Sequence, residues 1–246
     1  MLISIPAPSL AGETPLSAAR RVYTSLRTRI IEMRMPPGER IVERDIANEF
    51  GTSRTPVHEA VQRLADEGLV DVVPRVGTFV ARIPVEALDE AMVVRAALEG
   101  AIIEKATERA TPEGIARLRA ILDAQAEHVR NDDTRGFHRT DEAFHATLAE
   151  LSGYPGIWPV IQQTKTQLDR FRQLTLPIDG RMRDVIGEHL AVLDALAKGD
   201  PADAVTAMRG HLDQVLPALE TLRELWPDYF TSRAAVVAPP PNVVYL

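Results

Sequence analysis

The sequence predicts a mainly α-helical protein in two parts: helices with a small β-hairpin in the first third, then an all-α antiparallel helical bundle. β-prone runs occur only in the first third, whereas the remainder shows helical spacing of apolar residues interrupted by turn signals. The composition agrees with a globular fold, because 45% of the residues are hydrophobic and 26% are charged. We therefore expect a small mixed domain followed by a larger helical domain.

The first third is predicted to fold as a helix, a short helix, a tight turn, a helix and a hairpin. Pro36-Pro37-Gly38 ends the first helix, and Gly68 suits the left-handed position after the third. Pro56 suits the first turn of that third helix. The predicted helices are residues 16–35, 43–50 and 53–68, and the predicted strands are 69–73 and 78–81, on either side of a turn at 74–77. This order predicts a winged helix-turn-helix domain over residues 15–83, after a flexible tail at 1–14.

The remainder, from Val85 onward, shows no strand signal and divides into about six helices of roughly 15–25 residues. Turn signals mark the breaks, at residues 111–112, 131–133, 153–155, 177–180 and 199–201. Two breaks pair a good N-cap residue with proline at the first helical position, at Thr111-Pro112 and Asp200-Pro201. Helices of this length predict an antiparallel bundle. We place a linker at 84–92, the helical domain at 93–228 and a Pro-rich tail at 229–246.

Composition and charge exclude several classes of protein. The chain has no cysteine, which excludes disulfides, thiolate metal sites and cysteine nucleophiles. No run approaches the ~18 apolar residues of a membrane helix. The start of the chain lacks a basic secretory signal, so we expect a soluble, cytoplasmic protein with no membrane partner. The net charge of −7 conceals a split, because residues 1–83 carry 11 arginines against 10 acidic residues, and charge alone leaves DNA binding open.

One face of the third predicted helix carries residues suited to reading DNA. The apolar face is formed by Val57, Val61 and Leu64. The polar residues on the opposite face are Arg54, His58 and Gln62. Arginine reads guanine and glutamine reads adenine with two hydrogen bonds each in the major groove. Ser53 and Thr55 at the helix start could bind a backbone phosphate, and Arg75 and Gly77 at the hairpin tip suit a narrow minor groove. The alternative is a solvated helix beside a hairpin.

Four residues of the helical part could bind a metal ion. Asp141 and His145 lie one turn apart on one helix, and His189 and His211 lie on two later helices. A carboxylate and three imidazoles suit a borderline divalent metal such as Zn or Ni. The alternative is that these histidines are surface or core residues held by hydrogen bonds, and we expect His138 to be solvated.

Four stretches of the first third form a pattern: 37–47 (PGERIVERDIA), 51–60 (GTSRTPVHEA), 68–70 (GLV) and 77–80 (GTFV). In this order they closely resemble the GntR family of bacterial transcriptional regulators. The resemblance implies that Arg44 and Arg54 contact operator DNA and that the glycine-bearing hairpin is the wing. One departure is His58, where the family usually carries arginine. We expect an altered base preference there, because a neutral imidazole makes fewer contacts than a guanidinium.

A second pattern lies in the helical part, at 94–99 (VRAALE), 141–145 (DEAFH), 188–189 (EH) and 207–212 (AMRGHL). It is similar to the all-α effector domain of the FadR subgroup, the FCD domain. The resemblance implies a metal at Asp141, His145, His189 and His211, whose shell is completed by the carboxylate of a small organic acid. Arg95 is expected to reach that carboxylate or to pair with Glu99 at i+4. Tyr154, where relatives often carry asparagine, is a second departure beside the expected effector.

Together the resemblances imply a ligand-responsive transcriptional regulator, most often a repressor, that binds a palindromic operator as a homodimer. The effector is expected to be a small carboxylate bound near Arg95 and Tyr154. One alternative is a metal-dependent hydrolase-like enzyme built on the Asp/His set, with Glu188 or Glu142 as general base. That alternative leaves the N-terminal domain unexplained. A third is an architectural DNA-binding protein that ignores small molecules.

Overall fold

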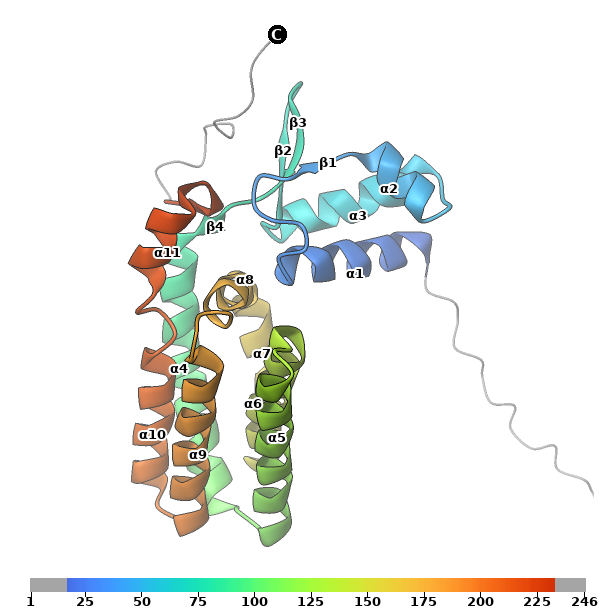
Figure 1. Ribbon diagram of the computed structural model, residues 1–246. Helices are drawn as coiled ribbons and strands as arrows, with labels where there is room; N and C mark the ends of the chain where they lie inside the picture. Colours follow the sequence, from blue (N-terminus) through green and yellow to red (C-terminus); the bar gives the residue numbers. More distant parts are fainter. Residues whose placement is uncertain (1–16, 233–246) are drawn as a thin grey trace, which may run out of the picture.

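The computed structural model describes residues 17–232, which form a small N-terminal domain and a helical bundle (Figure 1). The tail predicted at 1–14 and most of the tail predicted at 229–246 lie outside these residues. The elements of the N-terminal domain are α1 (Ala18–Ile31), β1 (Arg40–Ile41), α2 (Glu43–Glu49), α3 (Arg54–Asp66), β2 (Val70–Val73) and β3 (Gly77–Val80). The predicted winged helix-turn-helix is confirmed.

The three strands form one antiparallel sheet in the order β1-β3-β2. At the end of the hairpin Val73 pairs with Gly77, and the turn between them places Arg75 in the left-handed region, at φ 65°. Gly68 follows α3 at φ 68°, in the left-handed conformation predicted for it. The sequence does not predict β1, because two residues are too few to show strand alternation.

The core of the N-terminal domain forms between α1 and α3. The predicted apolar face of α3 is fully buried at Val57, Val61 and Leu64. These side chains share one core with the buried residues of α1, which are Val22, Leu26 and Ile30. Because this core holds one face of α3, the opposite face is directed to solvent.

The larger domain is a bundle whose helices run away from the N-terminal domain (Figure 1). Its long helices are α4 (Val85–Glu108), α5 (Pro112–Arg130), α6 (Thr134–Leu151), α9 (Arg181–Lys198) and α10 (Pro201–Asp213). Its shorter elements are α7 (Ile157–Thr164), α8 (Thr166–Thr175), α11 (Leu219–Leu225) and a 3-10 turn at Pro227–Tyr229. Thr111 and Asp200 cap α5 and α10 as predicted, by accepting hydrogen bonds from backbone N–H groups. None of the helices of residues 17–232 combines the length and the apolar run that a bilayer crossing needs.

All five predicted breaks fall between helices, but the prediction of about six helices is wrong. From residue 85 to residue 232 the chain forms eight α-helices. One unpredicted break lies at Lys165, between α7 and α8, and another separates α10 from α11. The first contains no glycine or proline, and the second is signalled only by Pro217.

A second small sheet joins the two ends of the helical domain. β4 (Ile83–Pro84) pairs in parallel with β5 (Phe230–Thr231), and Arg82 lies 3.9 Å from Asp228. The prediction of no strand from Val85 onward is therefore wrong at β5, and residues 230–231 pair with the fold. The stretch 84–92, predicted as a linker into the first helix of the helical domain, is helical from Val85 onward. Two-residue strands are fixed by tertiary pairing and leave no local pattern.

Candidate nucleic-acid interface and candidate metal centre

The exposed face of α3 carries the residues predicted to read DNA. All five are exposed, and they begin at the N-terminus of the helix: Ser53, Arg54, Thr55, His58 and Gln62. Ser53 stands at the N-cap in an extended conformation, and its side chain makes no capping hydrogen bond. The first-turn N–H groups of a helix lack intrahelical partners, so this end of α3 can accept a phosphate.

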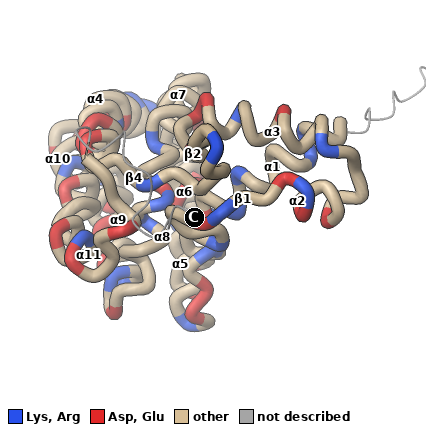
Figure 2. Tube along the Cα trace, turned by 90° about the horizontal axis from the view of Figure 1, so that it is seen from above, with Lys and Arg blue, Asp and Glu red and all other residues tan. Residues whose placement is uncertain are grey.

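Two further predicted DNA contacts flank α3. Arg44 is exposed on α2, and its Nε lies 3.2 Å from Oδ1 of Asp45. Arg75 is exposed in the turn of the β2–β3 hairpin, close to Gly77. The hairpin projects away from the helices (Figure 1). Acidic and basic positions are interspersed along α1 to α3 rather than separated by sign (Figure 2). Recognition therefore has to depend on individual side chains rather than on net charge.

His58 has a partner that the sequence does not predict. Its Nδ1 lies 2.9 Å from Oε1 of Glu43, the first residue of α2. The side chain of Glu43 is 19% exposed, whereas that of His58 is 60% exposed. The imidazole thus rests on a largely enclosed carboxylate at one edge and faces solvent at the other.

Three histidines from three helices meet inside the bundle. His145 of α6, His189 of α9 and His211 of α10 are all buried. Their ring centroids lie 4.5 to 5.4 Å apart, and one ring nitrogen of each lies within 4.8 Å of the other two. The fold thus brings together three of the four residues predicted to bind a metal.

Each of these imidazoles has an oxygen close to Nδ1, but only the Nδ1 atoms of His189 and His211 form a hydrogen bond. The pairs are His189 with Gln125 at 3.1 Å, His211 with Glu188 at 2.7 Å, and His145 with Glu99 at 2.5 Å. The Nε2 atoms of His189 and His211 are buried without a hydrogen-bond partner. Metal-binding histidines have this arrangement, in which one nitrogen donates to a fixed acceptor and the other keeps its lone pair for the ion.

Asp141 borders the three imidazoles but is held by another group. Its Oδ1 accepts a hydrogen bond of 2.7 Å from Arg172 of α8 and lies 3.7 Å from Nε2 of His189. Its Oδ2 is buried and has no partner. One carboxylate oxygen is therefore committed to Arg172, and the other remains to complete a metal shell.

Burial and charge set the protonation states of this cluster. Burial lowers the pKa of His189 and of His211 well below the ordinary value for histidine. Burial alone raises the pKa of Asp141, but the charge of the Arg172 guanidinium holds it well below its ordinary value. Two neutral imidazoles and one carboxylate are the forms that bind a metal ion.

Arg95 provides a second buried cation beside the cluster. Its Nε donates to Glu99 at 2.7 Å, which is the i, i+4 pair weighed from the sequence. Another of its nitrogens lies 3.5 Å from Nε2 of His145. Arg95 and Arg172 thus border the imidazoles from two different helices, α4 and α8.

Two other predicted positions differ from expectation. Tyr154, predicted to bind the effector, is half-exposed before α7, and Arg109 lies 5.1 Å from its ring centre. It is a surface residue paired with a surface cation. His138, expected to be solvated, is mostly enclosed, and its Nε2 lies 3.9 Å from Asp169. That expectation is wrong, because α8 packs over the face of α6 that carries His138.

The sequence also leaves out several residues that shape the site. Gln125, Glu99 and Arg172 contact the histidines or Asp141, and the sequence does not indicate them as site residues. The sequence offers Glu188 only as the general base of an enzyme, whereas in the structure it contacts His211 and Arg181. The sequence does indicate that Gln125 is buried, because it continues the helical spacing of Leu118 and Leu122 on α5.

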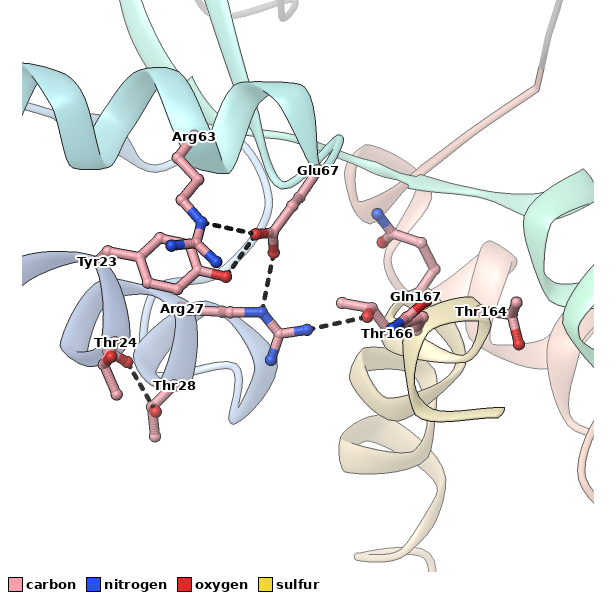
Figure 3. Close-up of a pocket in the computed structure, with 10 residues that line it drawn as sticks. Tyr23, Thr24, Arg27, Thr28, Arg63, Glu67, Thr164, Thr166 and Gln167 are labelled. Atoms are coloured by element: carbon pink, nitrogen blue, oxygen red, sulfur yellow. Dashed lines mark hydrogen bonds and ion pairs between the residues drawn. The ribbon is translucent and has the colours of Figure 1, made fainter. Parts of the chain in front are cut away.

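α8 also contacts the N-terminal domain, across a cleft of about 670 Å³. Arg27 of α1 donates to Oγ1 of Thr166 at 3.2 Å, and its Nε pairs with Glu67 at 2.9 Å (Figure 3). Gln167 donates to the carbonyl of Gly68, just after α3, at 3.0 Å. Arg170 is buried and donates to the carbonyl of Ala81 at 2.6 Å. One short helix therefore contacts α1, the end of α3 and the exit of the wing.

Comparison with known proteins matches both domains. Residues 18–80 match the gntR family of bacterial regulatory proteins, and residues 90–214 match the FCD domain. The chain is 35% identical over 226 residues to an HTH-type transcriptional regulator in an unstable DNA locus of Streptomyces ambofaciens, covering 92% of this chain and 94% of that one. It is 26% identical to the HTH-type transcriptional repressor RspR of Escherichia coli K12, over 86% and 93% of the two chains. The fold is similar to that of E. coli McbR/YncC, with a TM-score of 0.70 at 22% identity, covering 84% of this chain and 99% of that one.

Proposed function

Because the chain belongs to the GntR family and carries an FCD domain, we propose that it is a ligand-responsive repressor whose helical domain binds a divalent metal and a small organic acid. Proteins of these families are transcriptional regulators and not enzymes, so the metalloenzyme alternative is set aside. The repressor role is supported by the similarity to RspR, which is named as a repressor.

The DNA-binding role is supported by the exposed polar face of α3. Arg54 and Gln62 are exposed on a helix whose opposite face is buried in the domain core, so both are free to enter a groove. Arg44 engages only an exposed neighbour, and such a pair is weak enough to exchange for a phosphate.

The metal site is carried by one observation: the Nε2 atoms of His189 and His211 are buried without partners while their Nδ1 atoms are held by Gln125 and Glu188. A buried nitrogen without a hydrogen bond costs free energy unless something else occupies its lone pair. A divalent ion such as Zn or Ni would be held by these two histidines, His145 and the free oxygen of Asp141. It would supply a positive charge that attracts an acidic effector.

The organic acid is supported by the charges around the imidazoles. Arg95 and Arg172 are both buried within reach of the cluster, and a guanidinium binds a carboxylate with paired hydrogen bonds. An acid bound there would contact the ion through one carboxylate and an arginine through the same or a second carboxylate. Tyr154 is left out of this proposal, because its ring lies against Arg109.

The response to the ligand is supported by the position of α8. Its Arg172 contacts Asp141, while Thr166, Gln167 and Arg170 contact the N-terminal domain. A ligand that moves or fixes Arg172 would therefore shift the contacts of the same helix with α3 and the wing. Such a ligand changes DNA affinity only if it binds the two domain arrangements differently.

A homodimer is supported by an unpartnered face of α4. Val93, Ala97 and Ala101 are exposed at four-residue steps, and the side chain of Val93 is 70% exposed. A second copy packed on this stripe would bury it, and a two-fold symmetric dimer is the form that reads a palindrome.

The test combines metal analysis with DNA binding. The purified full chain should contain a divalent metal, and a chelator should lower its melting temperature, because a ligand of the folded state stabilises it. Duplexes selected by the protein should change in affinity when the metal is removed and when dicarboxylates or sugar acids are added. If added Zn²⁺ and Ni²⁺ change neither the stability nor the DNA affinity of a metal-free preparation, the proposed metal site is wrong. The proposed DNA binding is not affected by that result.

A further inference from the structure

The pairing of His58 with Glu43 determines which ring nitrogen carries the hydrogen. An ionised carboxylate only accepts hydrogen bonds, so the Nδ1 that lies 2.9 Å from Oε1 of Glu43 carries a hydrogen. In the neutral imidazole the other nitrogen, Nε2, is then a bare acceptor. An arginine at this position would instead present donors only.

Glu43 is well placed to hold this tautomer. It stands in the first turn of α2, where a negative charge is favoured by the helix dipole. Its carboxylate is largely enclosed, and His58 is mostly exposed. The ring therefore has Nδ1 toward the protein and Nε2 toward solvent, on the face of α3 shared with Arg54 and Gln62.

We propose that His58 and Glu43 together select a base that offers an amino group in the major groove; the inference rests on the proposed DNA-binding role of α3. Adenine N6 and cytosine N4 are the amino donors of that groove, whereas guanine offers two acceptors there. In the neutral imidazole, the Nε2 acceptor matches either amino group and has no hydrogen to give to guanine. His58 contacts the base, and Glu43 is its positioning residue.

The consequence is a reversed hydrogen-bond polarity at one operator position. Arginine in this place selects guanine, because its donors match O6 and N7. Histidine held by Glu43 selects against guanine and accepts from adenine or cytosine. This chain should therefore prefer an operator that differs, at one position of each half-site, from one read by arginine.

Selection of bound duplexes from a randomised library by the full chain tests the proposal. We expect adenine or cytosine at one position of each half-site, identified as the position whose preference disappears with His58→Ala. His58→Arg should replace that preference by guanine. Affinity for the selected site should fall roughly threefold to tenfold in His58→Ala, the effect of losing one hydrogen bond.

Variants of Glu43 separate positioning from folding. Glu43→Ala should weaken the preference at that position and at no other. Glu43→Gln should retain it, because an amide oxygen still accepts from Nδ1. Glu59→Ala removes the same charge from the exposed surface of α3 and is the matched control, with no expected change at that position. A uniform loss of affinity at every position in Glu43→Ala would mean that Glu43 only supports the fold.

A second readout needs no DNA. The imidazole ¹⁵N shifts of His58 should show the tautomer with hydrogen on Nδ1 in the natural chain and in Glu43→Gln, and a mixture in Glu43→Ala. Guanine at the selected position, or hydrogen on Nε2 in the natural chain, would overturn the inference while DNA binding stands. If the natural chain enriches no duplex at all, the proposed DNA-binding function fails as well, which is a distinguishable result.

Discussion

Arg172 donates a hydrogen bond of 2.7 Å to Oδ1 of Asp141, and both side chains are buried. The pair joins α8 to α6 at the edge of the three imidazoles. Buried ion pairs are costly to break, because removal of one partner leaves the other charge uncompensated. The carboxylate that would complete the metal shell is thus held by the helix that also contacts the N-terminal domain.

Substitution of Arg172 should destabilise the metal-free protein. Arg172→Met leaves the Asp141 carboxylate buried without its cation, and breaking a buried pair in this way costs about 3–5 kcal/mol. Added Zn²⁺ should recover part of this loss by compensating the same charge. Urea denaturation with and without Zn²⁺ measures both effects. Arg183→Met, which removes an arginine from an exposed pair with Asp179, should change neither curve.

The histidines should determine the metal content. His189→Ala and His211→Ala each remove one of the unpartnered Nε2 atoms, and the bound metal should fall from about one ion per chain to a small fraction of that. Elemental analysis of dialysed protein measures it. His128→Ala removes a histidine paired with Asp133 and should retain the ion. Equal metal content in all of these variants would locate the ion elsewhere.

The stability of the metal-free protein should decrease between pH 8 and pH 5.5. Burial lowers the pKa of His189 and His211, so both stay neutral in the folded state while the unfolded chain takes up protons below its ordinary value of about 6.5. The unfolded state then binds more protons, and stability falls as the pH falls, by on the order of 1 kcal/mol per histidine.

Denaturation curves of the chelated protein at several pH values measure this slope. Carboxylates of the unfolded chain stay ionised between pH 8 and pH 5.5, so they contribute little to the slope of stability against pH. His189→Gln/His211→Gln should flatten the slope. An unchanged slope in that double variant would assign the effect to other groups.

Contacts of α8 with the N-terminal domain should carry the response of DNA binding to the metal. Thr166→Val/Gln167→Ala removes the acceptor of Arg27 and the donor to Gly68, so the ratio of DNA affinities with and without Zn²⁺ should move toward one. Couplings of this kind are about 1–3 kcal/mol, or roughly fivefold to 150-fold in affinity. Gln163→Ala, on the rim of the same cleft, is the matched control. A full response in the double variant would exclude this route.

The helix breaks that carry local chemistry could be predicted from the sequence. Thr111 and Asp200 form capping hydrogen bonds where each precedes a proline, and Gly68 takes the left-handed position after α3. The break at Lys165 could not be predicted, because no residue there breaks a helix. Lys165 is buried with its ammonium bonded to Glu142 and Asp169, so tertiary contacts fix its position.

The sequence indicates the residues that converge at the candidate site, but not the residues that surround them. His145, His189 and His211 converge because each lies on the inner face of its own helix. The contact of Arg172 with Asp141 joins residues 31 positions apart, and the contact of Gln125 with His189 joins residues 64 apart. Local periodicity holds no information on such pairs. His138 was misjudged for the same reason, since the helix that covers it follows an unpredicted break.

Ile83–Pro84 lie in the connection between the two domains, and they pair in parallel with Phe230–Thr231, which follow the last helix of the helical domain. This pairing holds the connection in place. A stop codon placed before Phe230 would therefore do more than shorten the protein. It would also remove the strand that pairs with the connection between the wing and α4, and would leave the contacts of α8 to hold the two domains together.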